Sequence, residues 1–270
     1  MNVTIIGCGW LGKSLGEQLH KSGHTVNGST RNPANFEKFE KVGIQAFLLD
    51  SVREVEIPKE VVATTAVLII TVPPTSRNKG LSGIEENRQF MENVLASFSK
   101  DVRVIYTSST GIYPKREREY YETYTFSDRE QKTSLFQLES AVTSSEKSSV
   151  ILRLGGLIGE GRHPIFSLEG REDVPNPEGP INFVHSGDVI AAIEKIMELP
   201  TVSGVYNLVN PMHPSRKSYY DGAAKYYGLM APSFARSPAI HRLIASKKVI
   251  QELDYKFRFP INRFPKIDQH

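Results

Sequence analysis

The stretch VTIIGCGWLG, residues 3–12, decides how this chain folds. A short apolar strand runs directly into three glycines with the spacing GxGxxG, and a segment of helical period follows them. Gly7 permits a tight turn off the strand, Gly9 lets backbone amides approach a pyrophosphate, and Gly12 lets the helix pack against the sheet. The amides and the helix dipole then favour an anion at this point. The stretch therefore predicts a dinucleotide-binding turn.

Beyond this turn, short β-branched runs alternate with longer segments of helical period. The predicted strands are residues 3–6, 24–29, 46–49, 67–72, 102–107, 150–154 and 205–209, and the predicted helices are residues 13–22, 35–42, 84–97, 135–144 and 189–199. Most of the strands are apolar throughout, as expected where helices cover both faces of a sheet. This alternation predicts an α/β fold with a doubly wound, mainly parallel sheet of the Rossmann type.

The alternation is interrupted in two places. A stretch with several prolines and glycines spans residues 159–180, and the sequence after Asn210 shows no clear period. We expect residues 1–154 and 181–210 to form the Rossmann domain. Residues 155–180 and 211–270 should then build a smaller carboxy-terminal lobe on the substrate side.

Composition limits the kinds of partner. The 270 residues are 39% hydrophobic and 23% charged, and the formal net charge is +3. This excess is too small to predict a nucleic-acid or membrane surface, so we expect a small-molecule substrate or a nucleotide as the partner. A single cysteine cannot form an internal disulfide, and no apolar stretch reaches the roughly 20 residues of a membrane-spanning helix. We therefore expect a cytoplasmic protein, while the sequence does not predict its oligomeric state.

The choice of cofactor is indicated where the second predicted strand ends. An NAD site usually has an acidic residue there for the ribose 2′-hydroxyl, whereas an NADP site offers arginine and hydroxyl groups to the 2′-phosphate. This chain has Ser29, Thr30 and Arg31 at that place. Arg31 can form a bidentate contact with a phosphate, which favours NADP over NAD. The alternative is a solvated loop arginine, in which case NAD remains possible.

Five segments together resemble a known family. They are GCGWLG (7–12), VIYTSSTGIYP (104–114), ILRLGGLIGEGRHP (151–164), INFVHSGDVIAAI (181–193) and YNLVN (206–210). In this order they are similar to the extended short-chain dehydrogenase/reductase superfamily, in its NAD(P)-dependent epimerase/dehydratase branch. The resemblance spans nearly the whole chain. It implies a sheet that binds the nucleotide and a carboxy-terminal lobe that closes on a substrate.

The resemblance also implies roles for individual residues. Ser109 matches the family's catalytic serine, Asp50 an acidic residue near adenine, and Val72 with Pro73 the place where the fourth strand meets the nicotinamide ribose. The expected cofactor site comprises Gly7, Gly9, Trp10, Leu11, Gly12, Ser29, Thr30, Arg31, Asp50, Val72, Pro73 and Ser108. Ser109 also has a structural interpretation, because a serine hydroxyl at a strand end can cap the following turn.

The chain departs from the family at the catalytic pair. The family's chemistry uses a tyrosine and, four residues later, a lysine on the same face of a helix. Counting from Ser109 and from Glu139, which resembles a family glutamate, the two places hold Gln131 and Leu135. A glutamine does not titrate, and a leucine offers neither charge nor hydrogen bond. The chain therefore lacks the general acid that the family uses.

Other side chains could replace the missing acid. Tyr113, Tyr120, Tyr121 and Tyr124 lie in or near a charged segment, together with Lys115 and Lys132. Tyr113 is the best candidate by position, although the resemblance makes it a structural tyrosine. The alternative is a solvated, mobile loop.

Three further residues have structural explanations beside functional ones. We expect His185 and Asp188 to form a structural pair at a helix start. Cys8 lies near a helix amino terminus, where a thiolate is stabilised, but a small residue filling a crowded turn is the simpler explanation. The spacing of His, Cys and carboxylates does not resemble a metal site.

Two functions therefore remain open. The chain is either an NAD(P)-dependent oxidoreductase or epimerase that acts on a small molecule with a non-standard acid, or a non-catalytic NADP(H)-binding sensor or regulatory module. Retention of Ser109 favours the enzyme. Loss of the Tyr and Lys pair favours the sensor.

Overall fold

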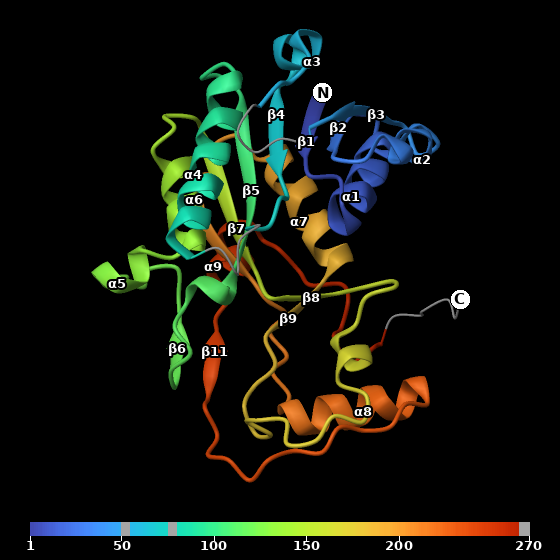
Figure 1. Cartoon of the computed structure of the whole chain (residues 1–270), viewed down its shortest axis with the longest axis vertical. Coiled ribbons are helices and arrows are strands. Elements are labelled where there is room, and N and C mark those ends of the chain that lie inside the picture. Colours follow the sequence, from blue (N-terminus) through green and yellow to red (C-terminus); the bar gives the residue numbers. More distant parts are fainter. Residues whose placement is uncertain (50–54, 75–79, 265–270) are drawn as a thin grey trace. The chain divides into compact units, whose positions relative to one another are not determined.

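A seven-stranded sheet forms the centre of the fold. The computed structural model, shown in Figure 1, describes residues 1–49, 55–74 and 80–264. The strand order is β10-β7-β5-β4-β1-β2-β3, and the pairs β1–β2, β1–β4, β2–β3 and β4–β5 are parallel. The strands are β1 (Asn2–Ile6), β2 (Thr25–Thr30), β3 (Ile44–Leu48), β4 (Val67–Ile70), β5 (Arg103–Ser109), β7 (Ser149–Leu154) and β10 (Gly204–Leu208). This arrangement confirms the predicted Rossmann-type fold and all seven predicted strands.

Helices alternate with these strands, and shorter elements fill the remaining connections. The helices are α1 (Trp10–Lys21), α2 (Phe36–Glu40), α3 (Lys59–Thr64), α4 (Gly80–Ser97), α5 (Asp128–Gln131), α6 (Ser134–Thr143), α7 (Ser186–Glu198), α8 (Arg216–Tyr227) and α9 (Lys247–Glu252). Three 3₁₀ turns, η1 (Pro33–Asn35), η2 (Thr110–Ile112) and η3 (Pro164–Ser167), join them. Two small parallel sheets pair β6 (Arg118–Tyr120) with β11 (Arg242–Ile244) and β8 (Gly156–Ile158) with β9 (Phe183–His185).

Strand β1 lies near the centre of the sheet and leads directly into the glycine turn. It pairs with β2 on one side and with β4 on the other, and Val3, Ile5 and Ile6 are fully buried. A strand covered on both faces has no solvent side, so its residues are mostly apolar, and the one polar side chain between Val3 and Ile5, that of Thr4, is buried as well. Where β1 ends, the chain turns through the three glycines into α1, which places the predicted dinucleotide turn at the carboxyl end of the central strand.

A cluster of buried apolar residues lies beneath α4 and α6, which run side by side in Figure 1. Leu68 and Ile70 of β4 pack there with Val94 of α4 and Val142 of α6. Burying a side chain of this size contributes about 1.5–3 kcal/mol. This packing fixes the ends of β4 and β5, which carry several of the expected site residues.

The chain divides into two compact units. The first comprises residues 1–112, 125–152 and 193–205, and the second comprises residues 113–124, 153–192 and 206–270. The first unit holds the glycine turn and α1 through α6. The second holds the two small sheets, α8 and α9.

One expectation about the second unit is wrong. The sequence after Asn210 suggested an irregular region, but the structure has the twelve-residue helix α8 there. Ser215 caps its first turn by accepting a hydrogen bond from the Ser218 amide, and Gly228 ends it in the left-handed conformation, with φ of 68°. Alanines and tyrosines form its buried face. Because these residues are less hydrophobic than leucine or isoleucine, the helical pattern is weak in the sequence although the side chains are buried.

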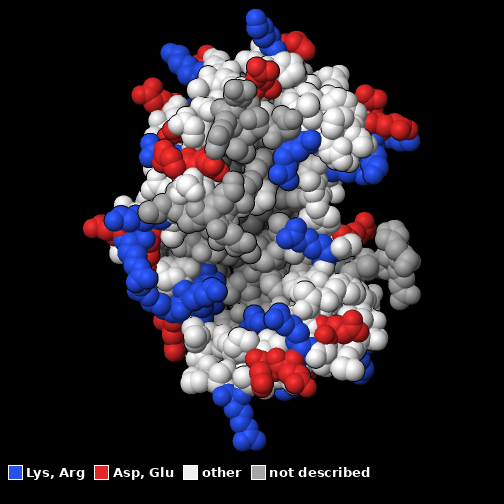
Figure 2. All heavy atoms as spheres, viewed as in Figure 1, with Lys and Arg blue, Asp and Glu red and all other residues white. Residues whose placement is uncertain are grey.

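The surface carries charges of both signs. Figure 2 shows acidic as well as basic side chains on the face that it presents, in keeping with a formal charge of only +3. Among the described residues, no helix is at once long and apolar enough to cross a membrane.

Candidate dinucleotide-binding site

Two of the three glycines in the turn are required by the protein's own packing. Gly7 has φ of 101°, and a Cβ there would lie 2.7 Å from Val72 Cγ2. A Cβ on Gly12 would lie 2.5 Å from the carbonyl oxygen of Gly7. The first residue therefore needs glycine for its left-handed backbone, and the second needs it because α1 approaches the strand end so closely. This agrees with the roles that the sequence assigned to them.

Gly9 is different, because no contact among the described residues requires a glycine there. Its backbone is extended, with φ of −77° and ψ of −152°, and the residue is exposed. A Cβ at this position would have no described atom within 4 Å. The missing side chain leaves open space directly above the amino terminus of α1. A ligand that approaches the backbone closely would explain this glycine.

The first turn of α1 has the properties of an anion site. Gly9 is the N-cap and has no side chain to offer, and the first turn holds no acidic residue. The Lys13 amide donates to the Gly9 carbonyl at 2.9 Å, which starts the helical hydrogen bonds one turn later. Trp10 is half-buried and Leu11 is buried, so these two anchor the turn through their side chains. The helix dipole at this end favours a pyrophosphate.

Hydroxyl groups from the two neighbouring strands contact Gly7. The Gly7 amide donates to Ser29 Oγ at 2.9 Å, and Thr71 Oγ1 donates to the Gly7 carbonyl at 2.6 Å. Ser29 is only 3% exposed, and its own carbonyl accepts a hydrogen bond from the Cys8 amide at 3.0 Å. Sequence reasoning did not single out Thr71. Its signal was a hydroxyl residue between the end of β4 and Val72.

Cys8 fills the crowded side of the turn. Its side chain is 7% exposed, and its Sγ lies 2.6 Å from the place that a Cβ on Gly28 would occupy. Burial raises the pKa of the Cys8 thiol to about 12. A thiol that stays protonated at neutral pH is a poor nucleophile. These observations support the packing role rather than a redox role.

The end of β2 forms an ordered loop around Arg31. Thr30 Oγ1 accepts hydrogen bonds from the Asn32 amide and from Asn35 Nδ2, each at 3.2 Å, and the Asn32 side chain caps η1 by accepting from Ala34 N at 3.0 Å. Arg31 is exposed at the tip of this loop. Its guanidinium is thus carried on a fixed backbone at the end of β2. Asp50, the expected adenine contact, lies outside the described residues.

Val72 and Pro73 follow β4 directly. Val72 is half-buried, and its Cγ2 is the atom closest to the place that a Cβ on Gly7 would occupy. Pro73 is exposed. The structure thus brings Val72 to the glycine turn, on the same edge of the sheet.

The two serines at the end of β5 have different surroundings. Ser108 is buried and donates to Glu139 Oε1 of α6 at 2.6 Å. Ser109 is half-buried, and its Oγ accepts a hydrogen bond from the Gly111 amide at 3.0 Å. Ser109 therefore does cap the turn that follows β5. A serine hydroxyl that accepts one hydrogen bond still has a proton to donate.

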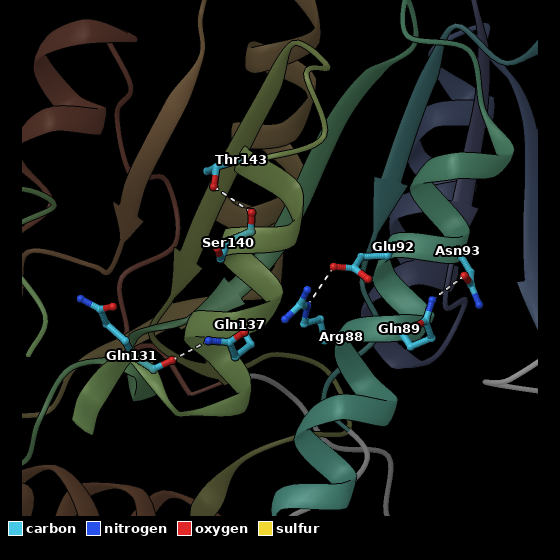
Figure 3. A network of polar contacts seen from close by, with 8 residues as sticks. All are labelled: Arg88, Gln89, Glu92, Asn93, Gln131, Gln137, Ser140 and Thr143. Carbon is cyan, nitrogen blue, oxygen red and sulfur yellow. Dashed lines mark hydrogen bonds and ion pairs between the residues drawn. The ribbon is translucent and has the colours of Figure 1, made fainter. Parts of the chain in front are cut away.

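Gln131 and Leu135 do not share a helix. Gln131 is the last residue of α5, whereas Leu135 belongs to α6, which begins only after Thr133 accepts a hydrogen bond from the Phe136 amide. The Gln137 side chain donates across the break to the Gln131 carbonyl at 2.9 Å, as Figure 3 shows. The family's single helix with both catalytic positions on one face is therefore interrupted here. The reason is local, since the Thr133 cap competes with a continuous helix.

Tyr113 occupies a structural place. It is 2% exposed; its hydroxyl donates to Asn207 Oδ1 at 2.8 Å and accepts from Arg153 Nη1 at 2.7 Å. Burial raises the pKa of Tyr113, although the Arg153 charge partly opposes this. Its ring packs against Tyr120 at 5.0 Å and Tyr124 at 6.0 Å between centroids. These tyrosines form a packed cluster in the second unit.

The histidines and Asp188 also have structural contacts. His185 Nδ1 accepts from the Gly187 amide at 3.0 Å at the start of α7, and Asp188 is fully buried. The Asp188 carboxylate accepts from Tyr255 Oη at 3.0 Å and from the Arg258 amide at 2.8 Å. Burial lowers the pKa of His185 and raises that of Asp188, and the charge of each partly opposes the shift of the other.

His163 Nδ1 caps η3, and its Nε2 lies 2.9 Å from Tyr219 Oη. Within the described ranges, no cluster of three or more His, Cys, Asp or Glu side chains could hold a metal ion.

Comparison with known proteins supports the fold of this chain. Residues 2–99 match the family described as NADP oxidoreductase coenzyme F420-dependent. UDP-glucuronic acid 4-epimerase from Bacillus cereus, solved in complex with NAD, is 15% identical with a TM-score of 0.79, covering 97% of this chain and 93% of that one. MoeE5 in complex with UDP-glucose and NAD is 16% identical with a TM-score of 0.77, covering 97% and 95%. The chain therefore shares the Rossmann-type fold of these two structures over nearly its whole length.

Two proteins without an assigned activity in their names are also similar. A functionally unknown conserved protein from Silicibacter pomeroyi is 20% identical with a TM-score of 0.74, covering 97% of this chain and 95% of that one. Protein YeeZ from Escherichia coli K12 is 31% identical over 272 residues, which cover 96% of each chain. The chain belongs to the family of protein YeeZ.

Proposed function

We propose that this chain binds NADP(H) at the glycine turn and acts as an NADP(H)-dependent oxidoreductase or epimerase on a small molecule. The observation that carries the binding proposal is the open space at Gly9. Gly7 and Gly12 are glycines for reasons internal to the protein, whereas Gly9 has extended dihedral angles and no described atom within 4 Å of a Cβ. A pyrophosphate lying against the backbone supplies the missing reason.

The residues around the turn fit a dinucleotide with a 2′-phosphate. The first-turn amides of α1, from Trp10 to Gly12, would hold the pyrophosphate together with the helix dipole. Arg31 would form charge-assisted hydrogen bonds with the 2′-phosphate. The family resemblance assigns Val72 and Pro73 to the nicotinamide ribose. No acidic residue directly follows β2 to favour NAD, since the chain continues as Arg31, Asn32 and Pro33.

A bound nicotinamide dinucleotide supplies hydride transfer, so the chain's own residues need only orient a substrate and handle a proton. Ser109 is the residue best placed to orient one. Its Oγ is fixed by the Gly111 amide, and its hydroxyl proton is free to point at a substrate carbonyl or hydroxyl. Leu135 Cδ1 lies 3.5 Å from the place of a Cβ on Gly111, so an apolar wall stands beside this serine.

The comparisons support the enzyme proposal at the level of the fold. MoeE5 and the Bacillus cereus epimerase were both solved with NAD, and each aligns with nearly the whole of this chain. Their nucleotide sugars belong to those proteins, and we propose no particular sugar for this one. The substrate class proposed here is a small molecule with a carbonyl or secondary alcohol, which is what hydride chemistry requires.

A second candidate is an NADP(H)-binding sensor without turnover. The observation that favours it concerns the two positions that the resemblance assigns to the catalytic pair. They hold Gln131 and Leu135, which lie on separate helices. Tyr113 does not replace them, because its hydroxyl is buried and bound to Arg153 and Asn207. General acid catalysis typically contributes about 10²–10⁴ in rate, so its loss would leave slow chemistry or none.

Calorimetric titration tests the binding proposal. The parent protein should bind NADPH, and Gly9→Val should abolish binding because the branched side chain fills the pyrophosphate space. Gly222→Ala is the matched control, since a Cβ in that α8 position would make only ordinary contacts of 3.7 Å or more. Equal affinity in the parent and in Gly9→Val would remove the turn from the site.

Turnover separates the two candidates. NADPH oxidation should be measured with a panel of carbonyl compounds in the parent and in Ser109→Ala. The enzyme proposal expects turnover that Ser109→Ala lowers while NADPH affinity stays nearly unchanged. Binding of NADPH with no turnover on any of these compounds would favour the sensor.

A further inference from the structure

The amide and the carbonyl of Gly7 each form a hydrogen bond with a side chain from β2 or from the residue after β4. The Gly7 amide donates to Ser29 Oγ of β2 at 2.9 Å, and the Gly7 carbonyl accepts from Thr71 Oγ1, just after β4, at 2.6 Å. Gly7 is where the central strand β1 leaves the sheet, since its φ is 101°. At such a point the sheet ladder no longer supplies partners, and buried backbone groups must find others. The two hydroxyls provide them from opposite sides.

The rest of the turn depends on this one peptide. The Gly7 carbonyl also accepts from the Gly9 amide at 2.7 Å, and the Cys8 amide donates to the Ser29 carbonyl at 3.0 Å. The direction of the Gly7 carbonyl therefore sets where Gly9 lies and how the first turn of α1 begins. The same carbonyl is the atom that a Cβ on Gly12 would strike. A small rotation at Gly7 would move every group that faces the proposed pyrophosphate.

We propose that Ser29 and Thr71 are positioning residues for dinucleotide binding, which act by fixing the Gly7 peptide from both sides. This inference rests on the proposed function. It gives Ser29 a different task from contact with the 2′-phosphate, because its hydroxyl is buried and engaged with Gly7. It also adds Thr71, a residue outside the GxGxxG motif.

Removing either hydroxyl should weaken dinucleotide binding. Ser29→Ala leaves the Gly7 amide without its acceptor, and Thr71→Val takes one donor from the Gly7 carbonyl. Without the hydrogen bond, part of the binding free energy is spent on returning the turn to its bound shape. The dissociation constant of the dinucleotide should therefore rise about fivefold to thirtyfold. Thr71→Ser keeps the hydroxyl and should restore most of the affinity.

A control variant separates positioning from general stability. Thr4 lies on the same strand β1, is fully buried, and its Oγ1 lies 2.7 Å from Thr65 Oγ1. Thr4→Val removes a comparable hydrogen bond well away from the glycine turn along β1. It should lower the melting temperature as much as Thr71→Val does, and leave dinucleotide affinity unchanged within twofold.

The experiment titrates each variant with a dinucleotide and with its pyrophosphate-free half. NADP⁺ is compared with adenosine 2′-monophosphate, or NAD⁺ with adenosine if NAD⁺ binds the parent more tightly. Ser29→Ala and Thr71→Val should weaken the dinucleotide and spare the half molecule, which does not reach the turn.

Four results would overturn the inference. Unchanged dinucleotide affinity in both variants would show that Gly7 needs no hydroxyls. An equal loss for the half molecule, or an equal loss in Thr4→Val, would show only a general weakening of the fold. If the parent binds neither dinucleotide, the proposed function itself fails, and the positioning role fails with it.

Discussion

Adding one methyl group should cost much more stability at Gly12 than at Gly9. A Cβ on Gly12 would lie 2.5 Å from the Gly7 carbonyl oxygen and 3.0 Å from Thr71 Oγ1. The first contact is with backbone, which cannot rotate away, so α1 would have to move off the end of β1. A Cβ on Gly9 would meet no atom of residues 1–49, 55–74 and 80–264 within 4 Å.

The magnitudes follow from these contacts. Overpacking a tight site costs about 1–3 kcal/mol, and the better helix propensity of alanine returns up to about 1 kcal/mol of it. Gly12→Ala should therefore lose roughly 1–2 kcal/mol, or roughly 2–8 °C in melting temperature. Gly9→Ala changes only an N-cap residue and should cost less than about 1 kcal/mol. Both variants should bind NADPH more weakly, for different reasons.

Thermal unfolding followed by circular dichroism, combined with NADPH titration, checks both expectations. Gly12→Ala should lose stability and affinity together, whereas Gly9→Ala should lose affinity with a nearly unchanged melting temperature. The reasoning is refuted if Gly9→Ala melts lower than Gly12→Ala, or if Gly9→Ala binds NADPH as well as the parent does. The first result would mean that the space above Gly9 is not open, and the second that it is not ligand space.

Three further predictions concern the cofactor, acid stability and the catalytic positions. NADPH should bind at least about tenfold more tightly than NADH, and Arg31→Ala should remove most of that preference in competitive titrations while Arg129→Ala should not, because a charged hydrogen bond to phosphate contributes about 1.5–3 kcal/mol. Burial lowers the pKa of His163 from 6.5 to about 4, so between these values the unfolded chain binds a proton that the folded chain does not. The contribution of neutral, buried His163 to the unfolding free energy should thus be complete above pH 6.5. Between pH 6.5 and about pH 4 it should fall by up to about 1.4 kcal/mol per pH unit. Denaturant titrations of His163→Gln should lack this pH-dependent loss. Gln131→Tyr combined with Leu135→Lys should leave NADPH oxidation at the parent's rate, since the two side chains leave different helices; a clear rise would show that a continuous helix can form there.

The sheet was predictable because burial on both faces leaves a simple pattern. Runs such as residues 3–6 and 67–72 contain almost only apolar and β-branched residues, and the structure places strands over most of each. The glycine turn was predictable for a related reason, because backbone conformation and close packing restrict residue choice at Gly7 and Gly12. Local physics determined these features, so a single sequence shows them.

The remaining features depend on contacts between distant residues or on weak signals. The bonds from Ser29 and Thr71 to Gly7 join residues 22 and 64 positions apart, which no local pattern reveals. Helix α8 was missed because its buried face is built from alanine and tyrosine, although Ser215 and Gly228 mark its two ends. A closer look at those capping residues would have found it.

The interruption between Gln131 and Leu135 shows the limit of counting from a motif. Spacing gave the two positions, but the Thr133 cap decides that α6 starts between them. Tyr113 shows a similar limit, because its motif position is compatible with catalysis until Arg153 and Asn207 are seen on its hydroxyl. Side-chain partners, rather than residue types, separate structural from functional groups at these places.

A crystal structure of the chain with NADP⁺ tests the dinucleotide site most directly. The pyrophosphate oxygens should lie above Gly9, within about 2.7–3.2 Å of first-turn amides of α1, and the 2′-phosphate should contact Arg31. The Gly7 amide should keep its bond to Ser29 Oγ. A dinucleotide bound at another place on the chain, with the space above Gly9 left to solvent, would contradict the proposed site.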